Sequence, residues 1–533
     1  MRIRRILAVA MTVVTVAGSL AGCGNKAASK DGAVDSSAYE GATLNVHFHS
    51  NNMYTIADAD GNLLPVYKFA SDQTKINIKN VANQVATNSS QEFQLQATQQ
   101  FPADIYGGTD LRQSINSFGV QGAFLPLEEL IDTYAPNIKK FLDDNADIKK
   151  SMTAADGHIY SLDYSPDGDV GRCYFIRQDW LDKLNLKQPT NLTEMETVLY
   201  AFKNNDPNSN GKKDEIPVFN DKWQEIVRLA NFWGARVFGF DSFAERVVLD
   251  NNDKFYQAWV APEFKTALKG LAKWYSDGII DPETFSRKVN TARATLWTKE
   301  NTGGMTNDFP ASTSLFNYNP ELLASTPAFK LTPILPVGQN GPTFVEHHRA
   351  LVKNDGWAIS AKTTNKIAAI KFMDWFYSNE GKQAANFGVE GLTYDIVNGE
   401  PKFKDTVLSQ ANVLSYLQKS IGAQLPIGYK QTFAYEKQWT SKIGQDAFDL
   451  YTAKANYAKQ TPTLSFNESE QDIFDTYLTN LNTYQDEMIT GFITGKYNVD
   501  TGWDAYVAKC KELGSDKLVK IYQLAYDRYT KVK

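Results

Sequence analysis

The sequence predicts an α/β fold, because short runs that alternate apolar and polar residues are interleaved with longer amphipathic segments. The chain has 533 residues, of which 42% are hydrophobic and 12% aromatic. That is enough material for two or more packed domains. No internal repeat is visible, and low complexity is confined to a stretch near the N-terminus. We therefore expect alternating strands and helices from about residue 42 onwards.

Three short segments carry the strand pattern. Residues 44–48 alternate Leu, Val and Phe with polar neighbours, which is typical of a half-buried strand. Residues 103–106 run into Gly107-Gly108, and this pattern predicts a strand that ends in a loop. Residues 159–160 follow a turn-forming Asp-Gly pair and indicate another short extended piece.

Apolar residues recur at helical spacing in the longer segments. The last helix has a clear apolar face formed by Leu518, Ile521, Tyr522 and Ala525. We expect helices at residues 178–184, 192–202, 264–275 and 367–376, and two more near the C-terminus.

The N-terminal segment predicts export. A basic start with Arg2, Arg4 and Arg5 precedes an apolar run over residues 6–16, and small residues follow it up to Cys23. This run is shorter than the ~20 apolar residues that a membrane-spanning helix needs. Residues 1–22 therefore have the plan of a cleavable secretory signal.

The residues before the expected cleavage point, Leu20-Ala21-Gly22-Cys23, resemble the bacterial lipobox. In that motif the cysteine is acylated, carries palmitate and becomes the first residue of the mature chain. The resemblance implies a lipoprotein anchored to the outer face of the cell membrane through Cys23. The alternative is an ordinary secreted protein with an accidental cysteine. Residues 23–41 are small and polar, so we expect a disordered tether.

Two cysteines follow Cys23, at Cys173 and Cys510, and there is no Cys-x-x-Cys pair. They cannot form a disulfide framework or a cysteine-based zinc site. Cys510 shares helical spacing with apolar neighbours, which indicates a small core residue. A disulfide between Cys173 and Cys510 remains an alternative, because exported proteins fold in an oxidising compartment.

The charge of the chain argues against a nucleic-acid or anionic-lipid surface, which requires clustered Lys and Arg. The formal net charge is −6, and loss of the three leader arginines makes the remainder −9. No Gly-x-Ser-x-Gly elbow, phosphate-binding loop or evident catalytic carboxylate pair is present. We therefore do not expect an enzyme.

Five segments resemble the extracellular solute-binding proteins of family 1, especially the LplA-like and alginate-binding branch. They follow the family's order and span nearly all of the mature chain. They are FPADIYGG, DGHIYSLDY, RQDWLDKLNLKQPTNLTEMETVLYAFK, NDGWAISAKTTNKIAAIKFMDWFYSNEGKQAANFGVEGLTY and FITGKYNVDTGWDAYVAKCKELGSDKLVKIYQLAYDR. The resemblance implies a two-lobe, periplasmic-binding-protein-like fold of type II, with a helix-rich C-terminal part. The chain is expected to cross between the lobes more than once.

From this order we expect an N-terminal lobe built from residues 42–160 and 288–350. The C-terminal lobe would contain residues 161–287 and 351–533. In open α/β sheets, ligands bind outside the carboxyl ends of the strands. The ligand would then lie in the cleft between the lobes, which would close by a hinge motion.

Residues 206–217, DPNSNGKKDEIP, resemble the first half of an EF-hand calcium loop. Oxygen-bearing side chains alternate and a glycine follows, as a hard cation requires. Pro217 stands where an EF-hand has its bidentate Glu. In the alginate-binding branch the loop closes early on an Asp-Glu pair. The implied ligands of a structural calcium ion are Asp206, Asn208, Asn210, Lys212 through its carbonyl, Asp214 and Glu215. The alternative is a polar turn without an ion.

His47 and His49 share one face of the first strand, a spacing that can suit zinc, and His347-His348 could add a ligand. Metal receptors related to this family are shorter chains of different architecture. We therefore do not expect a zinc site.

Aromatic residues favour a carbohydrate ligand, because the apolar faces of sugar rings stack on them. The chain has 26 Tyr, 30 Phe and 10 Trp. Positions after the expected strands, and turns that the resemblance implies to face the cleft, nominate ligand-binding residues. They are Asn51, Tyr54, Tyr106, Trp233, Asn307, Asp308, Trp357, Glu390 and Tyr394.

The sequence therefore predicts a monomeric, lipid-anchored receptor that captures an oligosaccharide by hinge closure. It would deliver this ligand to the membrane permease subunits of an ABC importer. Three alternatives remain: a peptide receptor, a surface polysaccharide hydrolase or lyase, and an adhesin or signalling protein without a small ligand.

Overall fold

Two β-sheets organise the protein in its computed structural model, which describes residues 36–51, 53–237, 246–287, 291–345 and 349–532. The expected signal, Cys23 and His347-His348 lie outside the described residues. Two units are distinguished, Met1–Ala38 and Tyr39–Lys533. The described part of the first unit is a short 3-10 turn, Ser36–Ala38.

The second unit begins slightly earlier than expected. The Gly41 N–H donates to the Lys75 carbonyl at 2.8 Å, and Tyr39 packs against the hydrophobic core. The expected tether of residues 23–41 is therefore too long, because its last three residues already belong to the folded body.

The first sheet has the order β2-β1-β3-β14-β4. β1 lies between β2 and β3 and is parallel to both, while β14 runs antiparallel to β3 and β4. The apolar side chains of β1 (Leu44, Val46 and Phe48) are at most 1% exposed, which confirms the strand predicted over 44–48. The strands are β1 (Thr43–His49), β2 (Asn77–Asn80), β3 (Ile105–Gly108), β4 (Ser161–Asp163) and β14 (Gly356–Ile359).

β3 contains the glycine pair that was predicted to form a loop. A Cβ atom at Gly108 would lie 1.7 Å from the His49 carbonyl oxygen, and the φ angle of Gly108 is +145°. The close approach of β1 therefore requires glycine at this position. The expected extended piece at 159–160 lies just before β4, which begins at Ser161.

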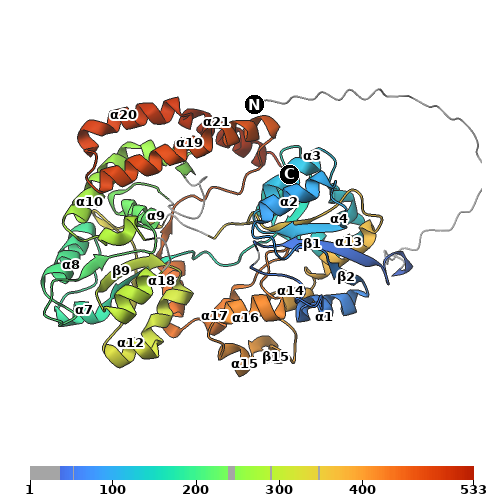
Figure 1. Ribbon diagram of the computed structural model, residues 1–533, viewed down its shortest axis with the longest axis horizontal. Coiled ribbons are helices and arrows are strands. Elements are labelled where there is room, and N and C mark those ends of the chain that lie inside the picture. The colour runs from blue at the N-terminus through green and yellow to red at the C-terminus, as the bar shows by residue number, and fades with distance from the viewer. Residues whose placement is uncertain (1–35, 52, 238–245, 288–290, 346–348, 533) are drawn as a thin grey trace, which may run out of the picture. The chain divides into compact units, whose positions relative to one another are not determined.

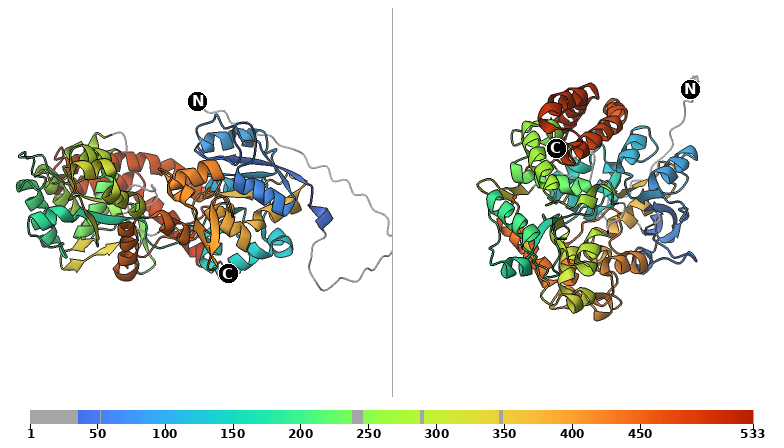
Figure 2. Two further views of the ribbon diagram at one scale, coloured as in Figure 1. Left: turned by 90° about the horizontal axis from the view of Figure 1, so that it is seen from below. Right: turned by 60° about the vertical axis from the view of Figure 1, so that its left-hand side comes forward.

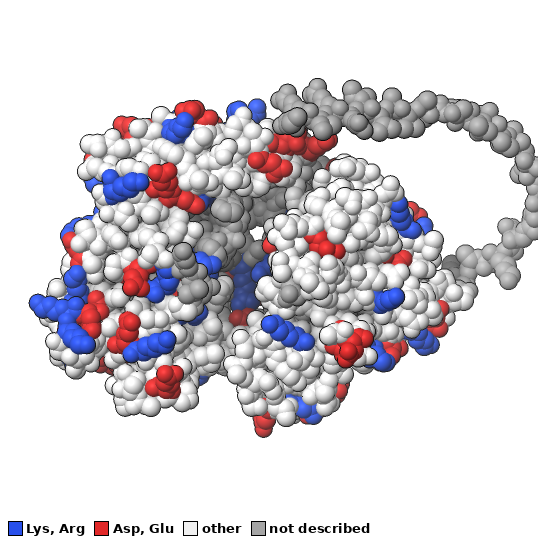
Figure 3. Space-filling view, viewed as in Figure 1, with Lys and Arg blue, Asp and Glu red and all other residues white. Residues whose placement is uncertain are grey.

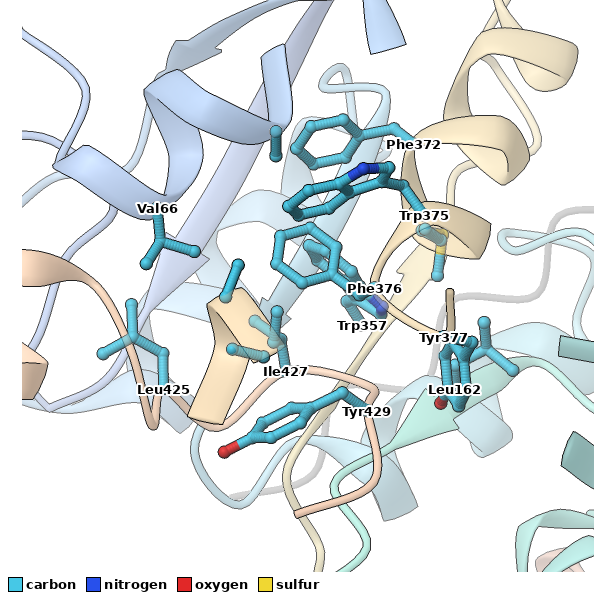
Figure 4. Close-up of a cluster of buried hydrophobic side chains, with 14 of the residues drawn as sticks. Val66, Leu162, Trp357, Phe372, Trp375, Phe376, Tyr377, Leu425, Ile427 and Tyr429 are labelled. Atoms are coloured by element: carbon cyan, nitrogen blue, oxygen red, sulfur yellow. The ribbon is translucent and has the colours of Figure 1, made fainter. Parts of the chain in front are cut away.

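Helices cover this sheet and form the first lobe. Its core contains Trp357 of β14 and Phe376, whose rings are 5.3 Å apart (Figure 4). The hairpin of β15 (Tyr394–Val397) and β16 (Glu400–Phe403) belongs to the same lobe. The helices are α1 (Pro65–Thr74), α2 (Ser89–Thr98), α3 (Arg112–Val120), α4 (Glu128–Tyr134), α5 (Pro136–Asp144), α6 (Ala146–Met152), α13 (Lys366–Trp375), α14 (Asn379–Phe387), α15 (Asp405–Leu408), α16 (Val413–Tyr416) and α17 (Phe433–Trp439).

The second sheet has the order β10-β5-β9-β6 and organises the second lobe. β9 is parallel to β6 and antiparallel to β5, which is also antiparallel to β10. Its strands are β5 (Cys173–Arg177), β6 (Ile216–Val218), β9 (Gly303–Asp308) and β10 (Leu331–Ile334). Three short pairs accompany it: β7 (Val247–Leu249) with β8 (Phe255–Gln257), β11 (Val337–Gly338) with β12 (Gly341–Pro342), and β13 (Phe344–Val345) with β17 (Asn456–Tyr457).

The C-terminal helices α19 and α20 pack on α10, and α21 packs on α19, α20 and β8, so the helix-rich end of the chain joins the second lobe (Figures 1 and 2). α19 begins with a reciprocal cap, in which the Glu470 N–H donates to Asn467 Oδ1 and the Asn467 N–H donates to Glu470 Oε2, both at 3.0 Å. The second-lobe helices are α7 (Gln178–Lys183), α8 (Leu192–Asn204), α9 (Trp223–Val227), α10 (Pro262–Ser276), α11 (Pro310–Thr313), α12 (Pro320–Ser325), α18 (Lys442–Lys454), α19 (Glu468–Ile493), α20 (Val499–Glu512) and α21 (Ser515–Tyr529).

The helices predicted from apolar spacing are confirmed as α7, α8, α10, α13, α20 and α21. None of the helices in the described ranges is both long and apolar enough to cross a membrane.

The expected division of the chain between lobes is wrong at two places. β9 pairs with β5 and β6, so residues 303–308 lie in the second lobe although 288–350 was assigned to the first. β14 pairs with β3 and β4, so residues 356–359 lie in the first lobe although 351–533 was assigned to the second. Each strand joins the sheet that buries its two faces, and sequence order does not reveal that choice.

The chain passes between the lobes more than once, as expected, and two of the connecting segments run side by side. The Tyr164 N–H donates to the Asp355 carbonyl at 2.8 Å, and the Lys353 N–H donates to the Tyr164 carbonyl at 2.9 Å. The Gln431 N–H donates to the Ser165 carbonyl at 2.9 Å. Backbone hydrogen bonds therefore hold the connections between the lobes together.

A buried ion pair lies at the first-lobe end of these connections. Arg112 Nε donates to Asp163 Oδ2 at 2.9 Å, and both side chains are at most 1% exposed. The Arg112 guanidinium also donates to the Ser151 carbonyl and to Ser465 Oγ. One side chain thus joins α3, α6, the end of β4 and the segment that precedes α19.

Replacing Arg112 by Met should lower the free energy of unfolding by about 3–5 kcal/mol, because it leaves a buried carboxylate without its partner. Burial already raises the pKa of Asp163 to about 7, and Arg112 is the main group that lowers it. In R112M this pKa rises further, so the folded state retains a proton that the unfolded chain releases above its ordinary pKa of about 3.9. Urea unfolding should therefore show that stability falls as pH rises above about 4 in both proteins, and that the fall continues to a higher pH in R112M than in the wild type, where it ends near pH 7.

The control is Lys139→Met, which removes a partner of Asp143 that is 47% exposed on α5. Exposed pairs contribute only about 0–1 kcal/mol. Equal losses in the two variants would contradict a structural role for the Arg112 ion pair.

Candidate functional site

Polar side chains gather where the parallel strands of the first sheet end. Beyond β1 and β3, Ser50 Oγ and Thr109 Oγ1 are 2.6 Å apart. Asp355 precedes β14 at the same edge, and its Oδ1 accepts a hydrogen bond from the Asp110 N–H at 2.9 Å. Burial raises the pKa of Asp355, and the nearby charge of Asp110 raises it as well. This edge therefore presents carboxylate acceptors.

Two of the predicted ligand residues lie at this edge. Tyr54 is half-buried and forms a β-bridge with Ser50, and burial raises the pKa of its phenol. Asn51 has a φ of +49°, and its Oδ1 accepts from the Ser89 N–H at 2.8 Å. The Asn51 side chain is thus engaged at the start of α2, while Tyr54 keeps an exposed part.

The corresponding edge of the second sheet contains a network of ion pairs. Arg172 Nη1 lies 3.0 Å from Glu225 Oε1 and 3.1 Å from Asp308 Oδ1. Arg293 Nη1 lies 3.1 Å from Asp308 Oδ2, and Arg293 Nε is 3.8 Å from Asp221 Oδ2. Asp221 and Glu225 follow β6, Asp308 is the last residue of β9, and Arg172 ends the connection from the first lobe. Burial raises the pKa values of Glu225 and Asp221, although the nearby arginines act to lower them.

The second edge also carries aromatic rings. Phe309, directly after β9, is 48% exposed, and the Arg172 guanidinium carbon lies 4.2 Å from its ring centroid. Trp223, after β6, is half-buried and stacks on Phe285 at 6.4 Å. The predicted residues Asn307 and Asp308 belong to this edge and are 5% and 6% exposed.

Three predicted ligand residues are core residues instead. The side chains of Tyr106, Trp357 and Tyr394 are at most 4% exposed. Tyr106 stacks on His47 at 5.2 Å, Trp357 packs under the first sheet, and Tyr394 packs on Phe387. Both faces of the first sheet are covered, so the rings on β3 and β14 are buried, and Tyr394 of β15 packs in the first-lobe core. This burial corrects their assignment to the cleft.

Trp233 and Glu390 also lie away from the strand ends. Trp233 packs on Trp274 of α10 with ring centroids 4.9 Å apart, and a Cβ atom on Gly270 would lie 2.2 Å from its ring. Glu390 is exposed in the turn between α14 and β15. Trp233 is the last residue of a 3-10 helix, Arg228–Trp233, that packs on α10.

Sequence reasoning missed Arg172, Asp221, Glu225, Arg293 and Phe309. Phe309 directly follows Asn307 and Asp308, which were predicted to bind the ligand. Its position after a strand could therefore have indicated it as a candidate as well. Arg172 precedes β5 and Glu225 follows β6, and the two meet because both strands pair with β9, which no spacing along the chain reveals.

The loop expected to bind calcium has the local hydrogen bonds of a cation-binding turn. Asp206 Oδ1 accepts from the Asn210 N–H at 3.1 Å, and Asp206 Oδ2 accepts from the Gly211 N–H at 3.0 Å. Asn210 Nδ2 donates to both oxygens of Asp214 at 3.0 Å. Lys183 Nζ donates to the Asp206 carbonyl at 3.3 Å and so borders the loop.

The fit of this loop to calcium depends on Glu215. Its side chain is 7% exposed, and neither carboxylate oxygen accepts a hydrogen bond from the described residues. Burial raises the pKa of Glu215, and the charges of Asp214 and Asp206 raise it further. A buried carboxylate without donors is costly, and a cation would supply the missing partner. The described residues contain no cluster of three His, Cys, Asp or Glu gathered as a metal site, so amide and backbone oxygens must contribute.

The histidines and cysteines have structural surroundings. His47 Nε2 lies 3.1 Å from Glu92 Oε1, and His49 Nδ1 lies 3.0 Å from Ser89 Oγ, all within the first lobe. Cys173 and Cys510 are both buried without a disulfide and belong to different hydrophobic clusters. The alternative disulfide is therefore absent from the structure.

Acidic and basic side chains are interspersed on the face shown in Figure 3, where the surface is hollowed between the lobes.

Two α/β lobes, connected by several chain segments and ending in polar strand edges, define a two-lobe solute-binding protein. Residues 57–383 match the bacterial extracellular solute-binding proteins, and the chain belongs to that family.

Three known proteins are similar to this chain over most of its length. The alginate-binding protein AlgQ2, solved without calcium ion, is 36% identical, with 92% of this chain and 98% of that chain covered and a TM-score of 0.76. The fructooligosaccharide ABC transporter substrate-binding protein FusA of Streptococcus pneumoniae is 25% identical over 79% of each chain. Lipoprotein LipO of Bacillus subtilis is 25% identical, with 75% of this chain and 76% of LipO covered.

Proposed function

We propose that this protein is the substrate-binding protein of an ABC importer and captures an oligosaccharide between its lobes. The observation that carries this proposal is the chemistry of the two strand edges. Each ends in fixed carboxylates close to partly exposed aromatic rings, namely Tyr54 in the first lobe and Phe309 in the second. Sugar recognition combines these features, because hydroxyls donate to carboxylates and ring faces stack on aromatics. AlgQ2 and FusA support the proposal through the ligand classes in their names.

The mechanism requires no covalent step. A ligand that contacts both edges stabilises the closed arrangement of the lobes, and the permease subunits would recognise that arrangement. The segments that connect the lobes, including residues 164–172, would act as the hinge. Their hydrogen bonds to one another would make them bend as a unit.

Thermal unfolding with a panel of oligosaccharides tests the proposed ligand class. A ligand at one hundred times its Kd adds about 2.7 kcal/mol to the stability of the native state. For a body of this size, that should raise Tm by roughly 2–3 °C. Chromatography of the same mixtures should recover the sugar intact.

Cleaved products would contradict the receptor proposal and support a surface hydrolase or lyase instead. A shift with peptides and none with sugars would favour the peptide receptor. If neither class shifts Tm, the adhesin or signalling alternative gains support.

We also propose that Cys23 is acylated and holds the protein at the outer face of the cell membrane. LipO, a lipoprotein by name, supports this, together with the lipobox-like residues before Cys23. The expected result is that labelled palmitate enters the wild-type protein but not Cys23→Ser, which should be recovered from the medium. Cys510→Ser is the matched control and should stay in the membrane fraction. A labelled, membrane-bound C23S protein would refute the anchor.

We further propose that residues 206–215 bind a structural calcium ion. Asp206, Asn208, Asn210, Asp214 and Glu215 would hold it through side-chain oxygens, and Lys212 would use its carbonyl. The ion would neutralise the carboxylates and fix the loop before β6. It would take no part in ligand capture. AlgQ2, whose structure was solved without calcium ion, supports a link between calcium and this family.

The double variant Asp206→Ala, Asp214→Ala should lower Tm and abolish its dependence on calcium, as measured by thermal unfolding with calcium or chelator. Asp58→Ala is the matched control, since Asp58 accepts similar backbone hydrogen bonds from Asp60 and Asn62 in an exposed turn. This control should keep the calcium response of the wild type. An unchanged wild-type Tm in chelator would show that no calcium is bound.

A further inference from the structure

The helices α19 and α21 reach from the second lobe back to the first (Figure 1). α19 has 26 residues, which make about 39 Å of helix, and its C-terminal half is buried in the second-lobe core with α21. Near its N-terminal end, Gln471 Oε1 accepts a hydrogen bond at 2.9 Å from Gln113 Nε2 of α3, in the first lobe. Near the C-terminal end of α21, the Tyr529 ring centroid lies 6.0 Å from Lys150 Nζ of α6, also in the first lobe. Both helix ends therefore meet the first lobe.

These helix ends, residues 465–471 and 528–529, are here named the tip, and they are joined to each other. Arg528 Nη1 donates to Glu470 Oε1 at 2.6 Å, and Arg528 Nη2 donates to the Ser465 carbonyl at 2.9 Å. Because Glu470 also caps the start of α19, one side chain fixes both the helix end and its partner on α21. The two parts of the tip are thus held as one unit.

The segment before α19 divides its side chains between the two lobes. Leu464 and Phe466 pack against the second-lobe core. Ser465 lies between them, and its Oγ accepts from Arg112 Nη2 at 2.8 Å and donates to the Thr153 carbonyl at 3.0 Å, both in the first lobe. Successive side chains point to opposite sides here, as they do along a strand. The tip is therefore attached to the second lobe by apolar packing and to the first lobe by polar contacts.

The contact between the tip and the first lobe has the character of an interface that opens. Gln113 and Gln471 are both partly exposed, so water can replace their hydrogen bond. A cavity of about 20 Å³, enough for one water molecule, lies between α6 and α21. Its lining includes Lys150, Thr153, Ser465, Arg528 and Tyr529. Polar, imperfectly packed surfaces of this kind are typical of domains that move relative to each other.

The tip moves with the second lobe, because α19 and α20 pack on α10. A rotation of this lobe about the connecting segments would carry the tip across α3 and α6. We propose that the tip is a latch, which holds the lobes in the arrangement of this structure, where the surface between them is hollowed (Figure 3), and which releases when they close. This inference rests on the proposed function, because it names a device that regulates the same closure. The latch would lower the population of the closed form, and with it the apparent affinity for a ligand that requires closure.

The test measures the distance between the lobes by pulsed electron paramagnetic resonance on the full chain without ligand. Lys68→Cys on α1 and Lys269→Cys on α10 replace exposed residues and carry one spin label in each lobe. The background is Cys23→Ser. Cys173 and Cys510 are buried, so they should not take up label.

Gln113→Glu should broaden the distribution of interlobe distances. Its carboxylate would face two acceptors, Gln471 Oε1 and the Asp475 carboxylate, which accepts from the same Gln471 side chain at 2.8 Å. Adding Gln471→Lys to this variant should restore the narrow distribution, because an ion pair then replaces the lost hydrogen bond. The matched control is Gln91→Glu, which makes the same charge change at an exposed position of α2 in the first lobe. It should match the wild type.

The effect on affinity is measured by calorimetry with tetrasaccharides of glucose, mannose, fructose, mannuronate and galacturonate. For any sugar in this panel that binds the wild type, Q113E should bind about two- to fivefold more tightly, which is the range expected for one exposed polar contact. Equal distance distributions in wild type and Q113E would overturn the latch, and so would weaker sugar binding by Q113E. A broadened distribution without binding of any sugar would support the latch and contradict the proposed function.

Discussion

The buried pair of Arg112 and Asp163 is the constraint on which the arrangement of this chain depends. Taking both ions out of water costs several kcal/mol each, so the pair is stable only if its hydrogen bonds are satisfied. Ser161 Oγ donates to Asp163 at 2.6 Å, and the remaining Arg112 donors reach Ser151 and Ser465. Asp163 is the last residue of β4, directly before the connection to the second lobe. The pair therefore fixes the point where the connection starts.

The position of that starting point decides what meets at the strand edges. Nine residues after Asp163, the connecting segment ends at Arg172, whose guanidinium pairs with Glu225 after β6 and with Asp308 at the end of β9. The backbone of the same segment pairs with residues 353–355, which lead into β14. One extended segment thus begins at Asp163, which is fixed in the first lobe, and ends at Arg172, the central cation of the second strand edge. In the proposed mechanism, a hinge built in this way would transmit ligand contacts directly to the connection.

The sequence predicted much of the fold because the hydrophobic patterns were local and regular. β1 and the helices α7, α8, α10, α13, α20 and α21 lie where periodicity indicated. The 26-residue helix α19 was missed, since Thr, Asn and Gln interrupt its apolar face, although the reciprocal cap of Asn467 and Glu470 was a readable signal. The predicted lobe boundaries were wrong for another reason. β9 and β14 each join a sheet far from them in sequence, and long-range pairing leaves no local pattern.

The candidate site was less predictable, because a buried ring and a ligand-facing ring look alike in a sequence. Both faces of the first sheet are covered, so Tyr106 on β3 and Trp357 on β14 are buried although they lie on opposite faces. Phe309 directly follows β9, whose residues are all buried, and its ring is 48% exposed. Arg172, just before the first paired residue of β5, lies against one face of that ring. The end of one strand pair thus places an exposed ring next to a buried cation.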